Sequence, residues 1–467
     1  MAYRPRAAAA SPLYRAVLDN LETYLVERKL SRDDPSNPCA EFSLRSFLQC
    51  GIPRFGVARF LCRKCGESRF VPYSCKRRMV CPSCDAKRAV IESSHALDEL
   101  LPAVPYRQWV LVLPKRLRYF VHRDPRLPGE ISRILAETLT GFYRLRCAAP
   151  KDAAPAQFHV LQRFGSSVNL HLHDHAVVSD GSFSLAGGIL RFHPAPPLDE
   201  GEIKKLVEGL RRRILKRMLR LQAVPETSVA EMLLWPHSGF SLDGGTCVEA
   251  EDRAGLERLL HYVLRPAFSL KQLTYKPEED LVRYLPRKGG HGGKGNFTRE
   301  LEWSGVEFVK RVAALVPPAR RHMVRYYGAL GPRSPLREGV SSAARGKAAG
   351  CDLKEGYSIT PVGAVVRVVK QSVKAGARTW AACIRRIFEV DPVLCVCGAE
   401  MKLAAVVLDD GELSRVMAHQ GWAVDFPKTK ASRSPPMRSL VADEGGQIDP
   451  RGEEWEGRQD SPLCVPA

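Results

Sequence analysis

The spacing of the cysteines constrains the fold of this chain more than any other feature of the sequence. In CRKCGESRFVPYSCKRRMVCPSC, two C-x2-C pairs are separated by fifteen residues: Cys62 with Cys65, and Cys81 with Cys84. This spacing is typical of a zinc ribbon, in which two thiolate pairs close one tetrahedral Zn²⁺ site with Zn–S bonds of about 2.3 Å. The sequence therefore predicts a structural zinc site formed by these four cysteines.

Two further cysteines, Cys50 and Cys75, flank these pairs. We interpret them as ordinary buried thiols, and additional metal ligands are the alternative. Others, such as Cys147, Cys247 and Cys351, are scattered singly, which does not fit a disulfide framework. The sequence has no recognisable secretory signal and no apolar run of about 20 residues. We therefore expect a cytoplasmic, nucleoid-associated protein with no membrane partner.

A formal net charge of +20 indicates a polyanionic partner, and nucleic acid is the partner that fits it best. Basic side chains gather around the predicted ribbon, and the aromatic residues between them are able to stack on bases. The predicted DNA contacts in this module are Arg54, Arg59, Lys76, Arg77, Arg78, Lys87 and Arg88. A zinc staple with a merely solvated charged face is the alternative.

A second basic region is the segment LDEGEIKKLVEGLRRRILKRMLRLQ, residues 198–222. Its apolar residues recur at helical spacing, which predicts an amphipathic helix with a cationic face. We expect Arg211, Arg212 and Arg213 on this helix to contact DNA phosphates.

Three of the chain's 12 histidines occupy alternate positions in NLHLHDHAVV, residues 169–178. In a strand, alternate side chains share one face, so His171, His173 and His175 project together while Asp174 points away. Neutral imidazoles in such a row are able to bind one divalent cation. An imidazole-rich exposed strand is the alternative. Because metal ligation requires neutral imidazoles, the metal hypothesis also predicts that activity falls at low pH.

Tyr262 lies in LLHYVLRPAF, a helical segment that ends where Pro266 interrupts it. No cluster of carboxylates accompanies the histidines, so a hydrolytic two-metal site is not favoured. A single cation combined with a protein nucleophile remains, and the phenol of Tyr262 is a candidate for attack on a phosphodiester. An ordinary core or rim tyrosine is the alternative.

Four segments together resemble the HUH-endonuclease superfamily, and within it the rolling-circle transposases of the IS91 (ISCR-like) type. In family order they are YSCKRRMVCPSC, LQRFGSSVNLHLHDHAVVSDG, HYVLRP and AALVPPARRHMVRYYGAL. A later segment, TWAACIRRIFEVDPVLCVCGAEMKL, resembles the C-terminal part of that family. The likeness therefore spans about residues 35–405.

This resemblance implies roles for individual residues. His173 and His175 align with the paired metal ligands, and His171 is an auxiliary ligand or a same-face neighbour. Gln162, on the partner strand, is a candidate third ligand. Tyr262 matches the catalytic tyrosine, and a proline stands four residues later, which implies a one-tyrosine enzyme.

Two positions depart from the family pattern. The middle of the histidine motif is usually bulky and apolar, whereas here it is Asp174, so a register with His171 and His173 as the pair is the alternative. The C-terminal segment of the family usually holds a further CxxC pair. Here it reads CVCG (Cys395 and Cys397), from which we expect no well-formed metal site.

These patterns and the resemblance predict an α+β fold, with an N-terminal zinc ribbon and an HUH-type antiparallel sheet flanked by helices. The expected organisation along the chain is a helical segment over 1–49, the ribbon over 50–92, the catalytic domain over 93–340, a helical segment with degenerate cysteines over 341–424 and a disordered tail over 425–467.

The activity that the resemblance implies is DNA transposition. With structural Zn²⁺ in the ribbon and Mg²⁺ or Mn²⁺ at the histidines, Tyr262 nicks single-stranded element ends and forms a 5′-phosphotyrosine. A later transfer rejoins the DNA and moves an insertion sequence by a rolling-circle type mechanism, with oligomerisation left open. Two alternatives remain: a replication-initiator or relaxase-like nickase, and a non-catalytic zinc DNA-binding protein derived from a transposase.

Overall fold

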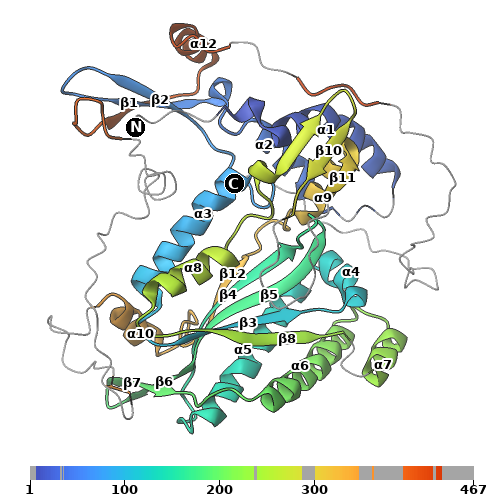
Figure 1. Cartoon of the computed structure of the whole chain (residues 1–467), viewed down its shortest axis with the longest axis vertical. Coiled ribbons are helices and arrows are strands. Elements are labelled where there is room, and N and C mark those ends of the chain that lie inside the picture. The colour runs from blue at the N-terminus through green and yellow to red at the C-terminus, as the bar shows by residue number, and fades with distance from the viewer. Residues whose placement is uncertain are drawn as a thin grey trace.

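The computed structural model describes residues 7–31, 34, 36–235, 239–286, 300–346, 360–361, 393–423 and 428–433. These residues form helices and mainly antiparallel sheets, which confirms the predicted α+β class. Figure 1 shows a lower body around a five-stranded sheet and an upper body that contains the first helices and the last strand. None of the described helices is long and apolar enough to cross a lipid bilayer. Most of the tail predicted over 425–467 lies outside the described residues.

The central sheet has the strand order β12–β4–β5–β3–β8, and each neighbouring pair is antiparallel. Its strands are β12 (Val324–Gly328), β4 (Ala156–Phe164), β5 (Leu170–Ser179), β3 (Tyr106–Val112) and β8 (Ser241–Val248). The histidine-bearing strand β5 is the middle strand. Every residue of β4 is buried, because protein layers cover both faces of the sheet. The sheet is therefore a rigid support for the side chains that β5 presents.

Two layers cover the two faces of this sheet. The first layer consists of α4 (Lys115–Arg123), α5 (Leu127–Arg146), α6 (Glu200–Arg220) and α7 (Glu226–Leu234). The second layer consists of α8 (Arg253–Val263), α10 (Arg337–Ala344) and η3 (Ala96–Leu100). Along β5, Leu172 and Ala176 join the core of the first layer, and Val177 joins the core of the second. Alternation along the strand therefore places the three histidines on the face that α8 covers.

The upper body has a hydrophobic core of its own. It is formed by α1 (Pro12–Leu30), α2 (Cys39–Leu48), α9 (Gly305–Leu315) and a sheet of β9 (Leu273–Lys276), β10 (Leu281–Tyr284) and β11 (Leu301–Ser304). α1 begins at Ser11, whose hydroxyl accepts a hydrogen bond from the backbone N–H of Tyr14, and Pro12 occupies its first position. The N-terminal helices therefore share one core with segments from the middle of the chain.

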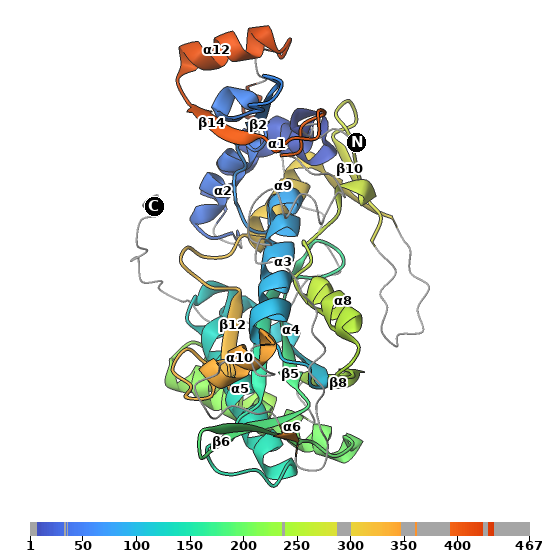
Figure 2. The same cartoon turned by 90° about the vertical axis from the view of Figure 1, so that its left-hand side faces the viewer.

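A three-stranded sheet at the top of the molecule joins segments from both ends of the chain. Its order is β14–β1–β2, with β1 (Val57–Leu61), β2 (Ser68–Pro72) and β14 (Lys402–Val407). Helix α12 (Asp410–His419) follows β14, and its Leu413 packs on Val57 and Phe70. Figure 2 shows β14 and α12 at the same end of the molecule as β2. We call these three strands and α12 the ribbon module.

The remaining elements connect these parts. Helix α3 (Pro82–His95) runs from the region of the ribbon module down to the lower body, as Figure 2 shows. Strands β6 (Gly181–Ala186), β7 (Ile189–Pro194) and β13 (Thr360–Pro361) form a small separate sheet. The single-turn helices are η1 (Ala8–Ala10), η2 (Pro53–Phe55) and η4 (Leu270–Gln272).

Candidate functional site

The three imidazoles of β5 form a row on the sheet. The ring centroids of His171 and His173 are 5.0 Å apart, and those of His173 and His175 are 4.7 Å apart. Among the described residues, three or more His, Cys, Asp or Glu ligand atoms lie within 4.8 Å of one another only in two cysteine clusters. The ligand atoms of the three imidazoles therefore do not converge on one point.

His173 faces Gln162, its register partner on β4. The amide nitrogen of Gln162 donates a 2.6 Å hydrogen bond to the carbonyl of Val263, which orients the amide with its oxygen toward the imidazole. This oxygen, Oε1, lies 3.1 Å from Nε2 of His173. Nδ1 of the same ring lies 2.9 Å from the carbonyl oxygen of His171, which accepts a hydrogen bond in the tautomer that carries its proton on Nδ1. Nε2 of the neutral ring then carries a lone pair.

The electrostatic environment favours the neutral form of His173 and His171. Burial lowers the pKa of His173, and the charges of Arg265 and Arg118 act in the same direction, against the His171 carbonyl. Burial and Arg118 lower the pKa of His171 to about 4. In the neutral tautomer with the proton on Nδ1, two acceptors face each other across 3.1 Å, Nε2 of His173 and Oε1 of Gln162. Neighbouring ligands of an octahedral cation with bonds of about 2.1 Å lie about 3 Å apart, so the pair has the geometry of a cation site.

His175 contacts a buried amide on one side and Tyr262 on the other. Its Nδ1 lies 2.8 Å from the side-chain nitrogen of Gln108 on β3, so the orientation of this amide decides which ring nitrogen carries the proton. The imidazole meets the ring of Tyr262 edge-on, with centroids 5.8 Å apart and an interplanar angle of 86°. The structure thus brings together His175 and Tyr262, which are far apart in the sequence.

Tyr262 lies near the end of α8, which begins at Asp252. The carboxylate of Asp252 accepts a 2.7 Å hydrogen bond from the backbone N–H of Gly255 and caps the helix. Tyr262 is half-buried, and the guanidinium of Arg265 lies 4.8 Å from its ring centroid. Because the amide of Gln162 bonds to Val263, the next residue, one contact couples the candidate cation site to the tyrosine helix.

Asp174 points to the opposite face, as strand alternation predicts. Its Oδ2 accepts a hydrogen bond from the hydroxyl of Ser132 on α5 and lies 3.3 Å from Nδ1 of His159 on β4. Burial opposes ionisation of Asp174, but His159 and Ser132 outweigh it and lower the pKa of this carboxyl. The polar residue in the middle of the motif therefore belongs to a buried network that fastens α5 to the sheet.

The first cysteine cluster consists of Cys50, Cys75, Cys81 and Cys84. Sγ of Cys50 lies 3.6 Å from that of Cys81 and 3.7 Å from that of Cys84, and the Cys75–Cys84 distance is also 3.7 Å. In a tetrahedral site with Zn–S bonds of about 2.3 Å, the sulfurs are about 3.8 Å apart. The four thiols therefore fit Zn²⁺. The interpretation of Cys50 and Cys75 as ordinary buried thiols is wrong.

The second cluster corrects the predicted ligand set. It joins Cys62 and Cys65 to Cys395 and Cys397, so the prediction of one site from Cys62, Cys65, Cys81 and Cys84 is wrong. The reason is the hairpin between the two pairs. Strands β1 and β2 are five residues long, about 17 Å, and carry the Cys62–Cys65 turn to the end remote from Cys50 and Cys75. The CVCG cysteines, from which we expected no well-formed metal site, thus belong to a cluster of four thiols.

The basic residues predicted around the ribbon fall into two groups. Arg59 and Lys76 are exposed, and Lys87 is half-buried on α3. The others make internal contacts: Arg54 pairs with Asp410 at 2.9 Å, Arg77 lies over Phe42 at 4.2 Å, Arg78 donates to the carbonyl of Arg321 at 2.6 Å, and Arg88 pairs with Asp85 at 3.3 Å. These internal contacts position the module, whereas the exposed cations are accessible to a polyanion.

The three arginines predicted on the basic helix α6 also differ. Arg211 is buried, and its guanidinium donates to the carbonyls of Met232, Leu233 and Trp235 at 3.0, 3.2 and 3.2 Å. Its assignment as a DNA contact is therefore wrong, because the side chain satisfies the last carbonyls of α7. Arg212 and Arg213 are exposed and pair with Glu208 and Glu137 at 2.5 and 2.6 Å.

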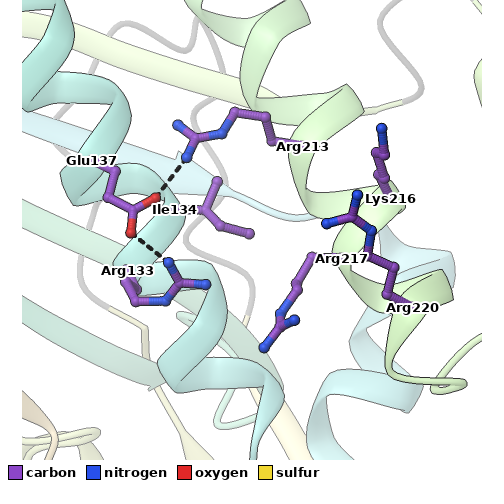
Figure 3. A pocket seen from close by; sticks show the side chains of 7 residues that line it. All are labelled: Arg133, Ile134, Glu137, Arg213, Lys216, Arg217 and Arg220. Atoms are coloured by element: carbon purple, nitrogen blue, oxygen red, sulfur yellow. Dashed lines mark hydrogen bonds and ion pairs between the residues drawn. The ribbon is translucent and has the colours of Figure 1, made fainter.

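A basic cavity of about 320 Å³ lies between α5 and α6 (Figure 3). It is lined by Arg133, Ile134, Glu137, Arg213, Lys216, Arg217 and Arg220. Glu137 pairs with both Arg133 and Arg213, as the dashed lines of Figure 3 show. Five cations against one acid in the lining leave an excess of positive charge, and Arg133, on α5, is not among the predicted DNA contacts.

Sequence reasoning missed three polar residues beside the histidines. Gln108 lies within strand β3, and Arg118 follows on α4; neither position carries a recognisable motif. Arg265 stands inside HYVLRP and was readable as part of that motif, but its position over Tyr262 depends on the turn after α8. The sequence also indicated that the Cys395–Cys397 pair resembles the Cys62–Cys65 pair, because a glycine directly follows each of them, Gly398 and Gly66.

Comparisons with known proteins match two segments of the chain. Residues 23–113 match a family model described as a transposase zinc-binding domain, of the IS91 type, and residues 157–337 match one described as "Putative transposase". "Putative transposase y4qJ" of Sinorhizobium fredii (strain NBRC 101917 / NGR234) is 28% identical over 293 residues, 58% of this chain and 69% of the relative. No solved structure matches. The chain is therefore similar to transposases in two segments, a zinc-binding segment near its N-terminus and a longer segment that contains the central sheet.

Proposed function

We propose that this chain is an HUH-type tyrosine transposase that uses Mg²⁺ or Mn²⁺ to nick and rejoin single-stranded DNA, and so moves an insertion sequence by a rolling-circle type mechanism. One observation carries the proposal: the opposed acceptors of His173 and Gln162 lie next to His175, whose ring contacts Tyr262. Metal-assisted cleavage of a phosphodiester through a covalent intermediate needs a cation site and a nucleophile in one place.

The proposed ligands of the cation are His173, His175 and Gln162. A bound cation supplies a Lewis acid that polarises the scissile phosphate. The protein fixes the ligands: the carbonyl of Val263 holds the Gln162 amide, and the carbonyl of His171 holds the imidazole of His173. For His175 to bind through Nε2, Nδ1 must carry the proton, so the amide of Gln108 must present its oxygen to the ring.

Tyr262 carries out the covalent step in this proposal. Its phenolic oxygen attacks the phosphorus, and the bond from Oη to phosphorus forms while the bond from phosphorus to the 3′ oxygen breaks. The phenol proton is released to solvent, and the leaving oxygen is protonated to a 3′-hydroxyl. The 5′-phosphotyrosine conserves the energy of the linkage for rejoining. Arg265, over the phenol ring, and Arg118, beside the histidines, supply positive charge for the phosphate oxygens.

The decisive experiment incubates the full chain with Mn²⁺ and single-stranded oligonucleotides of random sequence, followed by mass spectrometry of its peptides. We expect a nucleotide adduct on Tyr262 that is absent without the metal and absent in Tyr262→Phe. An adduct on Tyr326 or Tyr327 overturns the assignment. Both lie on β12, and Tyr327 contacts His159 at the network on the opposite face of the sheet.

The same experiment separates the two alternatives. A replication-initiator or relaxase-like nickase forms the adduct but does not join matched element ends in a strand-transfer assay. A non-catalytic DNA-binding protein forms no adduct, and Tyr262→Phe changes neither its DNA affinity nor any product. Either outcome overturns the transposase proposal.

A further inference from the structure

Four thiols from opposite ends of the chain meet in the ribbon module. Sγ of Cys62 lies 3.5 Å from that of Cys397, and Sγ of Cys65 lies 3.4 Å from that of Cys395. All four ligand atoms lie within 4.8 Å of one another. These distances are far longer than the S–S bond of about 2.05 Å in a disulfide. They approach the edge of about 3.8 Å expected for four thiolates around Zn²⁺.

The backbone around each pair has the same local design. Cys62 accepts at its carbonyl from the N–H of Gly66 at 2.9 Å, and Cys395 accepts in the same way from the N–H of Gly398, also at 2.9 Å. Both glycines have positive φ, 76° and 80°, a conformation that L side chains rarely adopt. Each segment is therefore a tight turn that holds two thiols on one side, although one pair has two intervening residues and the other has one.

A strand pairing supports the turns on both sides. Directly before Cys62, Leu61 of β1 pairs with Lys402 of β14, and the pairing continues back to Val57 and Val407. Cys62, Cys395 and Met401 form a small buried cluster at this end. The thiols thus stand at the end of an ordered antiparallel pair, and their convergence follows from the fold of both segments.

We propose that Cys62, Cys65, Cys395 and Cys397 bind a second structural Zn²⁺, which fastens the C-terminal strand β14 to the N-terminal strand β1. The matched zinc-binding domain covers residues 23–113 and so contains only half of these ligands. The ribbon module is therefore completed from the other end of the chain, and its sheet and α12 depend on a metal that bridges both. This inference does not rest on the proposed transposition activity.

The test measures the zinc content of the purified full-length chain by inductively coupled plasma mass spectrometry. We expect two Zn²⁺ per chain for the wild type and one for Cys395→Ser/Cys397→Ser. The matched control, Cys147→Ser/Cys247→Ser, changes two cysteines outside both clusters and retains two Zn²⁺. Cys75→Ser/Cys81→Ser, in the first cluster, retains one.

Folding is checked by circular dichroism and size-exclusion chromatography, so that zinc is counted only in the folded fraction. If the Cys395→Ser/Cys397→Ser chain does not fold, the wild type decides: two Zn²⁺ support the proposal and one overturns it. In the folded double variant, retention of the wild-type zinc content also overturns the proposal.

Absorption of the Co²⁺-substituted wild type gives a second readout, because two four-thiolate sites bind two Co²⁺ per chain with thiolate charge-transfer bands. Saturation of these bands at one Co²⁺ overturns it.

Discussion

At the scale of single residues, Gln162 does the most to define the candidate site. Its amide nitrogen is committed to the carbonyl of Val263, so its oxygen has to face the imidazole of His173. In the opposite orientation, the amide nitrogen of Gln162 would donate a hydrogen bond to Nε2 of His173, and two acceptors would no longer face each other. With the proton of His173 on Nδ1, this orientation leaves two acceptors facing each other, whereas a proton on Nε2 would make an ordinary hydrogen bond to the Gln162 oxygen.

The role of Gln162 predicts the effect of two substitutions on Mn²⁺ affinity, measured by isothermal titration calorimetry. Gln162→Ala removes one ligand and is expected to weaken binding by about 10- to 100-fold, as losses at metal sites commonly do. Gln162→Glu supplies a carboxylate, a ligand that Mn²⁺ favours, and is expected to bind at least as tightly as the wild type. Tyr262→Phe is the control and leaves affinity unchanged. Equal affinities for Gln162→Ala and the wild type would contradict the assignment.

Asp174 and His159 lead to a prediction about stability. Asp174→Asn removes the charge from a buried pair, and we expect the free energy of unfolding in urea to fall by about 3 kcal/mol. Replacing both residues by leucine removes both polar groups, so the double variant is expected to lose less stability than the sum of the single Asp174→Leu and His159→Leu variants. Additive losses would show that the two side chains do not act as a pair.

The sequence predicted part of the site at this scale. Strand alternation placed the three histidines on one face and Asp174 on the other, because it depends only on the period of a strand. The contacts of Gln108 and Arg265 depend on the register across β3–β5 and on the turn after α8. No local pattern encodes either of them.

At the scale of elements, the basic helix α6 has one face that packs against α7 and another that exposes cations. Its length and start were predictable, since Asp199 and Glu202 form a capping box at its beginning. The sequence did not predict which arginines of α6 point outward, because this depends on where α7 packs against it. The docking of α7 turns Arg211 inward, to the carbonyls at the end of that helix.

Arg211 and Arg212 are a matched pair for separating these functions. Arg211→Ala leaves the buried carbonyl of Met232 and two part-buried carbonyls after it without their donor, and we expect the free energy of unfolding to fall by about 2–3 kcal/mol. Arg212→Ala, at an exposed position, is expected to preserve stability within about 0.5 kcal/mol and to weaken single-stranded DNA binding. Urea denaturation and fluorescence anisotropy measure the two effects. A stable Arg211→Ala chain would contradict the structural role.

Helix α4 is joined to β4 by a contact that depends on pH. Nη2 of Arg163 donates a 2.6 Å hydrogen bond to Nδ1 of His122. Burial, with the charges of Arg163 and Arg123, lowers the pKa of His122 from 6.5 to about 3. The unfolded chain therefore binds an extra proton between these values, so stability is present above pH 6.5 and is lost as the pH falls toward 3.

His122→Gln tests this prediction, because glutamine keeps an acceptor for Arg163 and does not titrate. Between pH 7 and pH 5, the wild type is expected to lose about 2 kcal/mol more unfolding free energy than the variant. Titrating carboxylates are common to both chains and cancel in the difference. Parallel pH profiles from urea denaturation would show that His122 is not held neutral.

At the scale of the whole molecule, the cysteines show where sequence reasoning stopped. Spacing correctly indicated a thiolate metal site near the N-terminus, but pairing the nearest C-x2-C motifs assumed that ligands close in sequence share one metal. The β1–β2 hairpin separates them, and the missing thiols come from residues more than 300 positions away. Such a non-local closure is a property of the tertiary fold, which no local spacing encodes.

The arrangement of charge raises the question of whether one DNA strand contacts both ends of the molecule. Exposed Arg59 lies on β1 in the ribbon module, whereas exposed Lys216 lies on α6 in the lower body, at opposite ends of Figure 1. Each phosphate that a cation neutralises adds about 0.7 to the slope of log affinity against log salt for single strands. If one strand spans both regions, their contributions to this slope are additive.

The test measures single-stranded DNA affinity by anisotropy over a range of KCl concentrations. Arg59→Gln and Lys216→Gln are each expected to reduce the slope by about 0.7, and the double variant by about 1.4. The reason is that both cations release counterions from the same bound strand. If the two regions bind separate strands, a short oligonucleotide occupies the tighter region, and only one single variant changes its slope. A double variant no different from that single variant would therefore show that the two basic regions do not share one DNA path.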